Sequence, residues 1–221
     1  RIMIKGVAEY INIPIDTELL LSLYEKVKKD ANNTFGKTPF VSYSLEDNRT
    51  GKPTGYEQVF DPILSKHRRV HPYYQFRSTG FNTADSTEKD VFAHTDIDLD
   101  TQHPNNYNLV IPVLGKSRID YFETREDEIY LPEKNAHGYA YYHEFKAQKE
   151  MGQYTPEFEK FLSDRKIGEI IVEDRPILIK TDIMHRVVIT EAPRCAWVTR
   201  WNNVPKVLDY YDFKTMAENI L

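Results

Sequence analysis

The feature that most constrains the fold is a long series of short β-type segments between Pro72 and Trp201. Turn residues such as Gly115-Lys116-Ser117 separate most of these segments, and helices do not alternate with them as they do in a parallel α/β sheet. The pattern predicts a mainly β fold of the sandwich or jelly-roll type. Strands are expected at Tyr73–Phe81, Asp90–Asp96, Asn108–Leu114, Arg118–Glu123, Gly168–Glu173, Pro176–Thr181, His185–Thr190 and Cys195–Trp201.

Supporting helices are expected near both ends of the chain. Between Ile15 and Lys29, apolar residues recur at helical spacing after a capping residue, Asp16 or Thr17. A terminal helix is expected from Val207 to Leu221.

The length of 221 residues fits a single domain, with a β core at about residues 72–202. Inside this core, residues 124–166 form a charged, Tyr-rich insertion that is expected to be helical from Pro156 to Arg165. Two interpretations of the insertion are open. It is either a lid that excludes water from the mouth of the barrel or a subdomain on the surface.

Charge and hydropathy argue against several classes of partner. The net charge of -5 argues against binding to duplex nucleic acid, and no apolar run approaches the ~18 residues that a membrane-spanning helix needs. The single cysteine, Cys195, permits no intramolecular disulfide, and the first ten residues carry no signal-peptide pattern. We therefore expect a cytoplasmic protein that associates neither with membranes nor with duplex nucleic acid.

A candidate metal motif follows the apolar segment Val91-Phe92-Ala93. His94 and Asp96 are two residues apart, so on a strand both side chains point to the same face and can bind one cation. Among seven histidines, a single His-x-Asp pair arises by chance too often to be decisive alone. A second histidine, His185, opens a predicted strand near the C-terminus. Two imidazoles and one carboxylate suit iron(II) and leave coordination positions open.

The order His94-x-Asp96, His185, Arg194 resembles the iron(II)/2-oxoglutarate oxygenases. It is most similar to the branch of small amino-acid hydroxylases and aspartyl/asparaginyl hydroxylase relatives, in which a strand like Asn108-Leu109-Val110-Ile111-Pro112 follows the metal motif. The resemblance covers about half the chain. It implies a double-stranded β-helix (a cupin-like jelly roll), iron ligation by His94, Asp96 and His185, and 2-oxoglutarate and molecular oxygen as cosubstrates.

The resemblance also implies that Arg194 pairs with the far carboxylate of 2-oxoglutarate, a task suited to a planar guanidinium. Two features leave this anchor open. The family often places a hydroxyl residue two positions after the arginine, where this chain has Ala196. Arg200 is a rival anchor, because it lies six residues beyond Arg194 and so faces the same side of a regular strand.

Further residues are candidates for lining a cosubstrate or substrate pocket. Tyr73, Gln75 and Arg77 alternate on one expected strand face, which is either a cavity wall or an ordinary exposed face. Tyr107 and Asn108 are candidates of the same kind. Trp197 and Trp201 fall on the face opposite Arg194 and are expected to pack in the core.

Three functions are compatible with these patterns. The leading one is an iron(II)/2-oxoglutarate-dependent dioxygenase that hydroxylates a small molecule such as an amino acid and forms succinate. The second is a cupin-type metalloenzyme that does not use 2-oxoglutarate, although such barrels usually place more histidines at the metal. The third is a non-catalytic binding barrel with an incidental triad.

Overall fold

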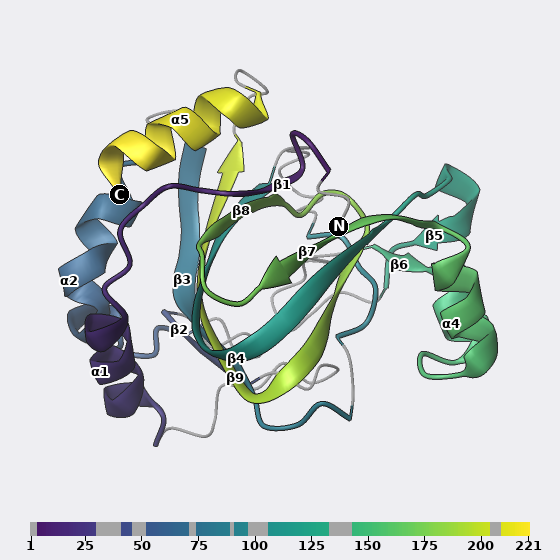
Figure 1. Cartoon of the computed structure of the whole chain (residues 1–221), viewed down its shortest axis with the longest axis horizontal. Helices are drawn as coiled ribbons and strands as arrows, with labels where there is room; N and C mark the ends of the chain where they lie inside the picture. The colour runs from purple at the N-terminus through teal and green to yellow at the C-terminus, as the bar shows by residue number, and fades with distance from the viewer. Residues whose placement is uncertain are drawn as a thin grey trace.

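The computed structural model describes residues 4–29, 41–45, 52–70, 74–88, 91–96, 106–132, 143–203 and 209–221. Its sheet is built from antiparallel strands, with helices packed outside it (Figure 1). The strands are β1 (Ala8–Tyr10), β2 (Val41–Ser44), β3 (Tyr74–Ala84), β4 (Asn106–Phe122), β5 (Ile129–Tyr130), β6 (Glu144–Phe145), β7 (Lys166–Val172), β8 (Ile177–Lys180) and β9 (His185–Asn203). The helices are α1 (Thr17–Val27), α2 (Glu57–His67), α3 (Lys146–Met151), α4 (Pro156–Ser163) and α5 (Tyr210–Ile220), with a 3₁₀ turn at Glu126–Glu128.

Two long strands, β4 and β9, are antiparallel partners along most of their lengths and create the jelly roll. Their first and last parts belong to different layers. Residues 107–110 of β4 pair with β8, whereas residues 117–122 pair with β7. The larger layer has the strand order β1-β8-β4-β9-β3-β2, and β7 extends the smaller layer from the other half of β4. The two layers curl toward each other and enclose an inner face.

Gly115 lies where β4 passes from one layer to the other. Its φ is +61°, and a Cβ built there would lie 2.3 Å from the carbonyl oxygen of Pro193. Both the left-handed backbone and the close approach require glycine. The β4–β9 register shifts on both sides of this residue, as expected where paired strands bend together.

The larger layer buries apolar residues on both faces. Its outer face packs against α1, α2 and α5 through an aromatic-rich cluster that includes Phe60, Trp197 and Phe213. Its inner face contributes Val110 and Val198 to a second cluster inside the barrel. Successive residues of β9 therefore alternate between the helix-covered core and the interior, which fixes the direction of every side chain on this strand.

The structure confirms the mainly β jelly roll and both terminal helices. The expected helix at residues 15–29 begins later because the Asp16 carboxylate accepts a hydrogen bond from the backbone N–H of Leu19 at 2.9 Å and caps the first turn. The apolar pattern did not predict α2. None of the described helices has the length and apolar composition required to cross a membrane.

Several strand predictions need correction. The segments expected at 108–114 and 118–123 form one strand, as do those expected at 185–190 and 195–201, because each turn signal marks a bend between layers and not a chain reversal. Residues 91–96 form only isolated bridges and not the expected strand. The sheet also extends beyond the expected core at 72–202, since β1 and β2 join its two edges.

His67, at the end of α2, makes the stability depend on pH. The side chain is 6% exposed, its Nδ1 lies 2.7 Å from Thr199 Oγ1, and its ring stacks on Trp201. Burial, together with the charge of Lys66, lowers the pKa of His67 from 6.5 to about 4. Between these values the unfolded chain binds a proton that the folded chain does not. The free energy of unfolding should therefore fall by about 3 kcal/mol as the pH falls from 6.5 to 4.

Urea unfolding of the metal-free protein and of His67→Phe, measured at several pH values between 7 and 4, checks this expectation. Other buried groups contribute equally to both proteins, so the difference between the two curves isolates His67. As the pH falls, the free energy of unfolding of wild type should decrease relative to that of His67→Phe. Parallel curves would show that His67 takes up no extra proton on unfolding.

Candidate metal centre

His94 and His185 are hydrogen-bonded partners across the smaller layer. The His94 N–H donates to the His185 carbonyl at 2.9 Å, and the His185 N–H donates to the His94 carbonyl at 2.9 Å. Residues in such an antiparallel pair project their side chains to the same face. The two imidazole centroids lie 4.7 Å apart. The backbone therefore brings together two candidate ligands that are far apart in sequence.

The backbone also sets the tautomer of both imidazoles. His94 Nδ1 lies 2.8 Å from the Phe92 carbonyl oxygen, and His185 Nδ1 lies 2.8 Å from the Ile183 carbonyl oxygen. A carbonyl can only accept, so each Nδ1 carries the proton and donates. Each Nε2 then presents a lone pair, as metal ligation by histidine requires.

Asp96 completes the group two residues after His94. Its Oδ1 lies 3.4 Å from His94 Nε2, and its Oδ2 accepts a hydrogen bond from Asn108 Nδ2 at 3.2 Å. Its backbone N–H donates to the Thr181 carbonyl at 2.6 Å, which holds this part of the chain against the end of β8. Asn108 thus fixes one carboxylate oxygen and leaves the other facing the imidazoles.

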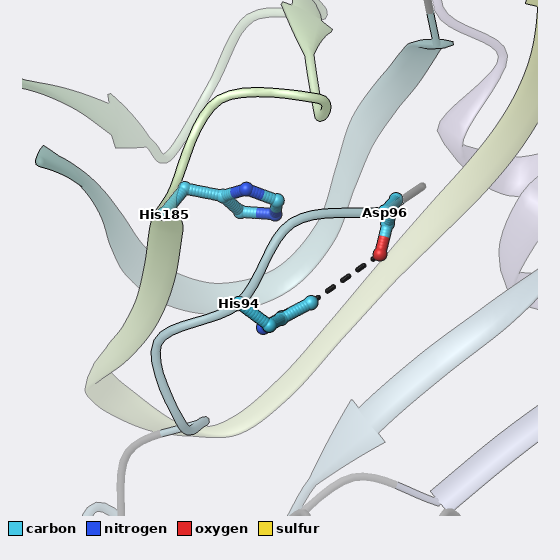
Figure 2. A group of neighbouring side chains, drawn as sticks. All are labelled: His94, Asp96 and His185. Atoms are coloured by element: carbon cyan, nitrogen blue, oxygen red, sulfur yellow. Dashed lines mark ion pairs between the residues drawn. The ribbon is translucent and has the colours of Figure 1, made fainter. Parts of the chain in front are cut away.

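The three side chains converge on one point (Figure 2). One potential ligand atom from each lies within 4.8 Å of the others, a separation that a single cation can bridge. Within the described part of the chain, no other group of three or more His, Cys, Asp or Glu residues meets this criterion. The set consists of two imidazole nitrogens and one carboxylate oxygen, and this chemistry suits iron(II).

The protonation states suit a cation. Burial tends to raise the pKa of Asp96, but its interaction with His94 and the nearby charges of His185 and Arg200 hold the pKa well below the ordinary range. Burial, assisted by the charge of His94, lowers the pKa of His185 to about 4. At neutral pH the aspartate is therefore ionised and His185 is neutral, as ligation requires.

Arg194 and Arg200 both lie on the inner face of β9 but at different depths. Arg200 pairs with Asn108, which contacts Asp96, so Arg200 is level with the triad. Arg194 begins about 20 Å further along the strand, by the rise per residue. Arg194 is 4% exposed, and its Nη1 donates to the Asn82 carbonyl at 3.1 Å. The residue opposite Arg194 on β3 is Ala84, and Asn82 lies two residues from Ala84 in the direction of the triad. Its guanidinium therefore extends along the barrel interior toward the triad.

Two hydroxyls inside the barrel were missed by the sequence interpretation. Tyr121 pairs with His185, and Ser117 lies four residues earlier on β4, nearer Arg194; both side chains are fully buried. Within the described part of the chain neither hydroxyl has a hydrogen-bond partner. Burial raises the pKa of Tyr121 well above 10, so its hydroxyl keeps its proton and can donate. Buried, unsatisfied donors on the wall of a barrel fit a ligand that carries oxygen acceptors.

Other candidates lie elsewhere or outside the described residues. Tyr107 was a candidate for lining the pocket, but it faces the outer core and stacks on Phe213 with ring centroids 4.8 Å apart. This correction follows from the alternation along β4, which turns Asn108 inward and Tyr107 outward. Trp197 and Trp201 pack in that outer core as expected. Tyr73 and the side chains of Gln75 and Arg77 lie outside the described residues.

Comparison of the sequence with protein-family models gives no match, and comparison with curated proteins gives no significant match. Solved structures do match. Apo HygX from Streptomyces hygroscopicus is 9% identical over 90% of this chain and 82% of its own, with a TM-score of 0.52. HygX with nickel and 2-oxoglutarate bound is 11% identical over 90% and 83%, with a TM-score of 0.51. SnoK, a non-heme alpha-ketoglutarate-dependent carbocyclase from nogalamycin biosynthesis, is 12% identical over 88% and 78%, with a TM-score of 0.50. These likenesses establish a shared jelly-roll fold.

Proposed function

We propose that this protein is an iron(II)/2-oxoglutarate-dependent dioxygenase that hydroxylates a small molecule, such as an amino acid. The observation that carries the proposal is the triad of His94, Asp96 and His185, with both Nε2 atoms available inside a jelly roll. Three protein ligands leave positions open for a chelating cosubstrate and for oxygen. Bound iron would supply oxygen activation, coupled to decarboxylation of 2-oxoglutarate to succinate.

The comparison structures support this choice of metal and cosubstrate, because HygX shares the fold and has been crystallised with nickel and 2-oxoglutarate. The segment Asn108-Leu109-Val110-Ile111-Pro112 favours the branch of amino-acid hydroxylases and aspartyl/asparaginyl hydroxylase relatives. Asp96 favours hydroxylation over halogenation, because halogenating relatives usually lack the carboxylate ligand. We also propose that residues 1–221 act as one cytoplasmic oxygenase domain.

Different residues of the barrel interior would bind different parts of 2-oxoglutarate. One end of the cosubstrate would bind beside the triad, so its far carboxylate needs a cation deeper in the barrel. Arg194 fits this position, because its guanidinium points along the interior toward the triad. The hydroxyls of Tyr121 and Ser117 are buried donors available to cosubstrate oxygens. Arg200 is level with Asp96 and is better placed to act on groups bound beside the metal.

The experiment that tests the proposal needs no substrate. Iron(II) and then 2-oxoglutarate are added to the protein without oxygen, and the visible absorption spectrum is recorded. A metal-to-ligand charge-transfer band that is absent from His185→Ala would support the proposal. Iron binding without a band would favour a cupin that does not use 2-oxoglutarate. Failure to bind iron would favour a non-catalytic barrel.

The same band measures the role of Arg194. Arg194→Met keeps a long apolar side chain but removes the guanidinium that would pair with the buried far carboxylate. Loss of one partner from a buried charge pair should raise the Kd for 2-oxoglutarate roughly 30-fold or more while iron affinity stays the same. Arg200→Met is the matched comparison. If it raises that Kd more than Arg194→Met does, the anchor is Arg200.

A further inference from the structure

The metal motif passes from one layer of the jelly roll to the other within three residues. His94 exchanges two backbone hydrogen bonds with His185 in the smaller layer. Two residues later, the Asp96 N–H donates to the carbonyl of Thr181, at the end of β8 in the larger layer. Thr95 lies at this crossing. Because the segment makes isolated bridges and is not a strand, no continuous ladder fixes the two ligands relative to each other.

Thr95 bonds this crossing to the insertion. Its N–H donates to the His143 carbonyl at 3.1 Å, and its Oγ1 accepts from the His143 N–H at 3.1 Å. In a regular antiparallel pair, the second bond would be made to the Thr95 carbonyl. Here the side-chain hydroxyl takes the place of that carbonyl, which allows the backbone after Thr95 to turn toward β8. The side chain is 5% exposed, so water has little access to the bond.

The insertion provides a packed support for this bond. Its strands β5 and β6 pair with each other, and Phe145 and Phe158 belong to one apolar cluster with Ala93 and Met184. Ala93 and Met184 each precede a histidine of the triad and point away from the barrel interior. The insertion therefore covers the outer side of the segments that carry both histidines. Packing of this kind holds neighbouring ligands in a fixed arrangement.

We propose that Thr95 is a positioning residue of the metal centre, and that its hydroxyl ties the metal motif to the insertion. Thr95 acts through its neighbours His94 and Asp96, because it fixes the backbone at the point where their directions are set. The insertion is then a structural part of the metal centre. The inference rests on the triad of the proposed function and is independent of the cosubstrate.

Thr95→Val tests this role, because valine keeps the β-branched shape and removes the hydroxyl. The His143 N–H is then left without its acceptor in the metal-binding arrangement, which disfavours that arrangement. The probe is cobalt(II), which accepts the same ligands as iron(II) and is visible by absorption. Its affinity should fall roughly 10- to 100-fold, as is typical for groups that orient metal ligands. The visible spectrum of the cobalt-loaded protein should also change, since it reports the geometry of the ligands.

Two further variants separate positioning from stability. Thr95→Ser retains the hydroxyl and should restore both the cobalt affinity and the spectrum of wild type. Thr155→Val removes the same kind of bond elsewhere in the insertion, because the Thr155 Oγ1 accepts from the Phe158 N–H at 3.2 Å and caps α4. It should lower the free energy of unfolding of the metal-free protein and leave cobalt binding unchanged. Urea unfolding of each metal-free variant measures the loss of stability.

Three results would overturn the inference. The first is a Thr95→Val protein that binds cobalt with the affinity and spectrum of wild type. The second is a Thr155→Val protein that loses as much cobalt affinity as Thr95→Val, because the cause would then be the stability of the insertion. The third is a failure of Thr95→Ser to restore binding, because the hydroxyl would then not be the group that matters.

Cobalt binding also separates this inference from the proposed function. If the Thr95 variants behave as expected but iron and 2-oxoglutarate give no charge-transfer band, the oxygenase proposal fails and the positioning role stands. If the band appears and Thr95→Val leaves cobalt binding unchanged, the oxygenase proposal stands and the positioning role is overturned. A wild-type protein that binds no cobalt would overturn both, because the triad would then hold no metal.

Discussion

Replacing Asp96 with alanine is expected to reduce 2-oxoglutarate turnover by roughly 10³-fold or more. A loss of this size corresponds to an increase of about 4 kcal/mol in the activation barrier. Asp96 supplies the anionic ligand of the triad, and its Oδ1 faces His94 Nε2 at 3.4 Å. Without it, two neutral imidazoles must hold the cation alone. Some stability should be lost as well, because the ionised carboxylate accepts a hydrogen bond from Asn108 and its pKa is lowered in the folded protein, but the variant should remain folded. Succinate formation and urea unfolding measure the two quantities.

Asp174→Ala is the matched control. Its side chain is 77% exposed in the loop between β7 and β8, and the variant should turn over 2-oxoglutarate as wild type does. Asp96→Asn adds a second comparison, because it keeps an oxygen for Asn108 but lacks the negative charge. If folded Asp96→Ala retained normal turnover, the assignment of the triad would be wrong.

The triad shows how much of a metal site a local sequence motif can predict. His94 and Asp96 are two residues apart, so the sequence alone could propose that they share a face. The 90 positions between His94 and His185 carry no such information. Their proximity depends on a mutual backbone pairing between β9 and a segment too irregular to count as a strand. From the sequence, only the resemblance to the oxygenase family links the two histidines.

The missed residues share a physical reason. Tyr121 and Ser117 look like ordinary strand residues, and their significance lies in buried hydroxyls without partners, a property of the packed structure. Alternation along a strand could place Arg194 and Arg200 on one face, but their depths depend on where β9 bends between the layers.

The same alternation that turns Ala196 and Val198 inward turns Trp197 outward, into the helix-covered core. Trp197 is fully buried and packs edge to face against Phe60 and Phe81, with ring centroids 4.9 and 4.8 Å away. Its indole N–H donates to Thr199 Oγ1 at 3.1 Å. Trp197→Ala should therefore lower the free energy of unfolding by about 3–5 kcal/mol, through lost burial and the cavity that remains. Urea unfolding followed by circular dichroism measures the loss.

The position of Trp197 allows its effect on stability to be separated from any effect on the binding of iron and 2-oxoglutarate. The indole lies on the face of β9 opposite the barrel interior, so the folded fraction of Trp197→Ala should still give the iron–2-oxoglutarate band. Trp197→Phe keeps an aromatic ring against Phe60 and should cost distinctly less than alanine. A loss below about 1 kcal/mol for alanine would mean that α2 collapses into the space, since the cost of such a cavity depends on how far its walls relax. That outcome would contradict a rigid attachment of α2 to the sheet.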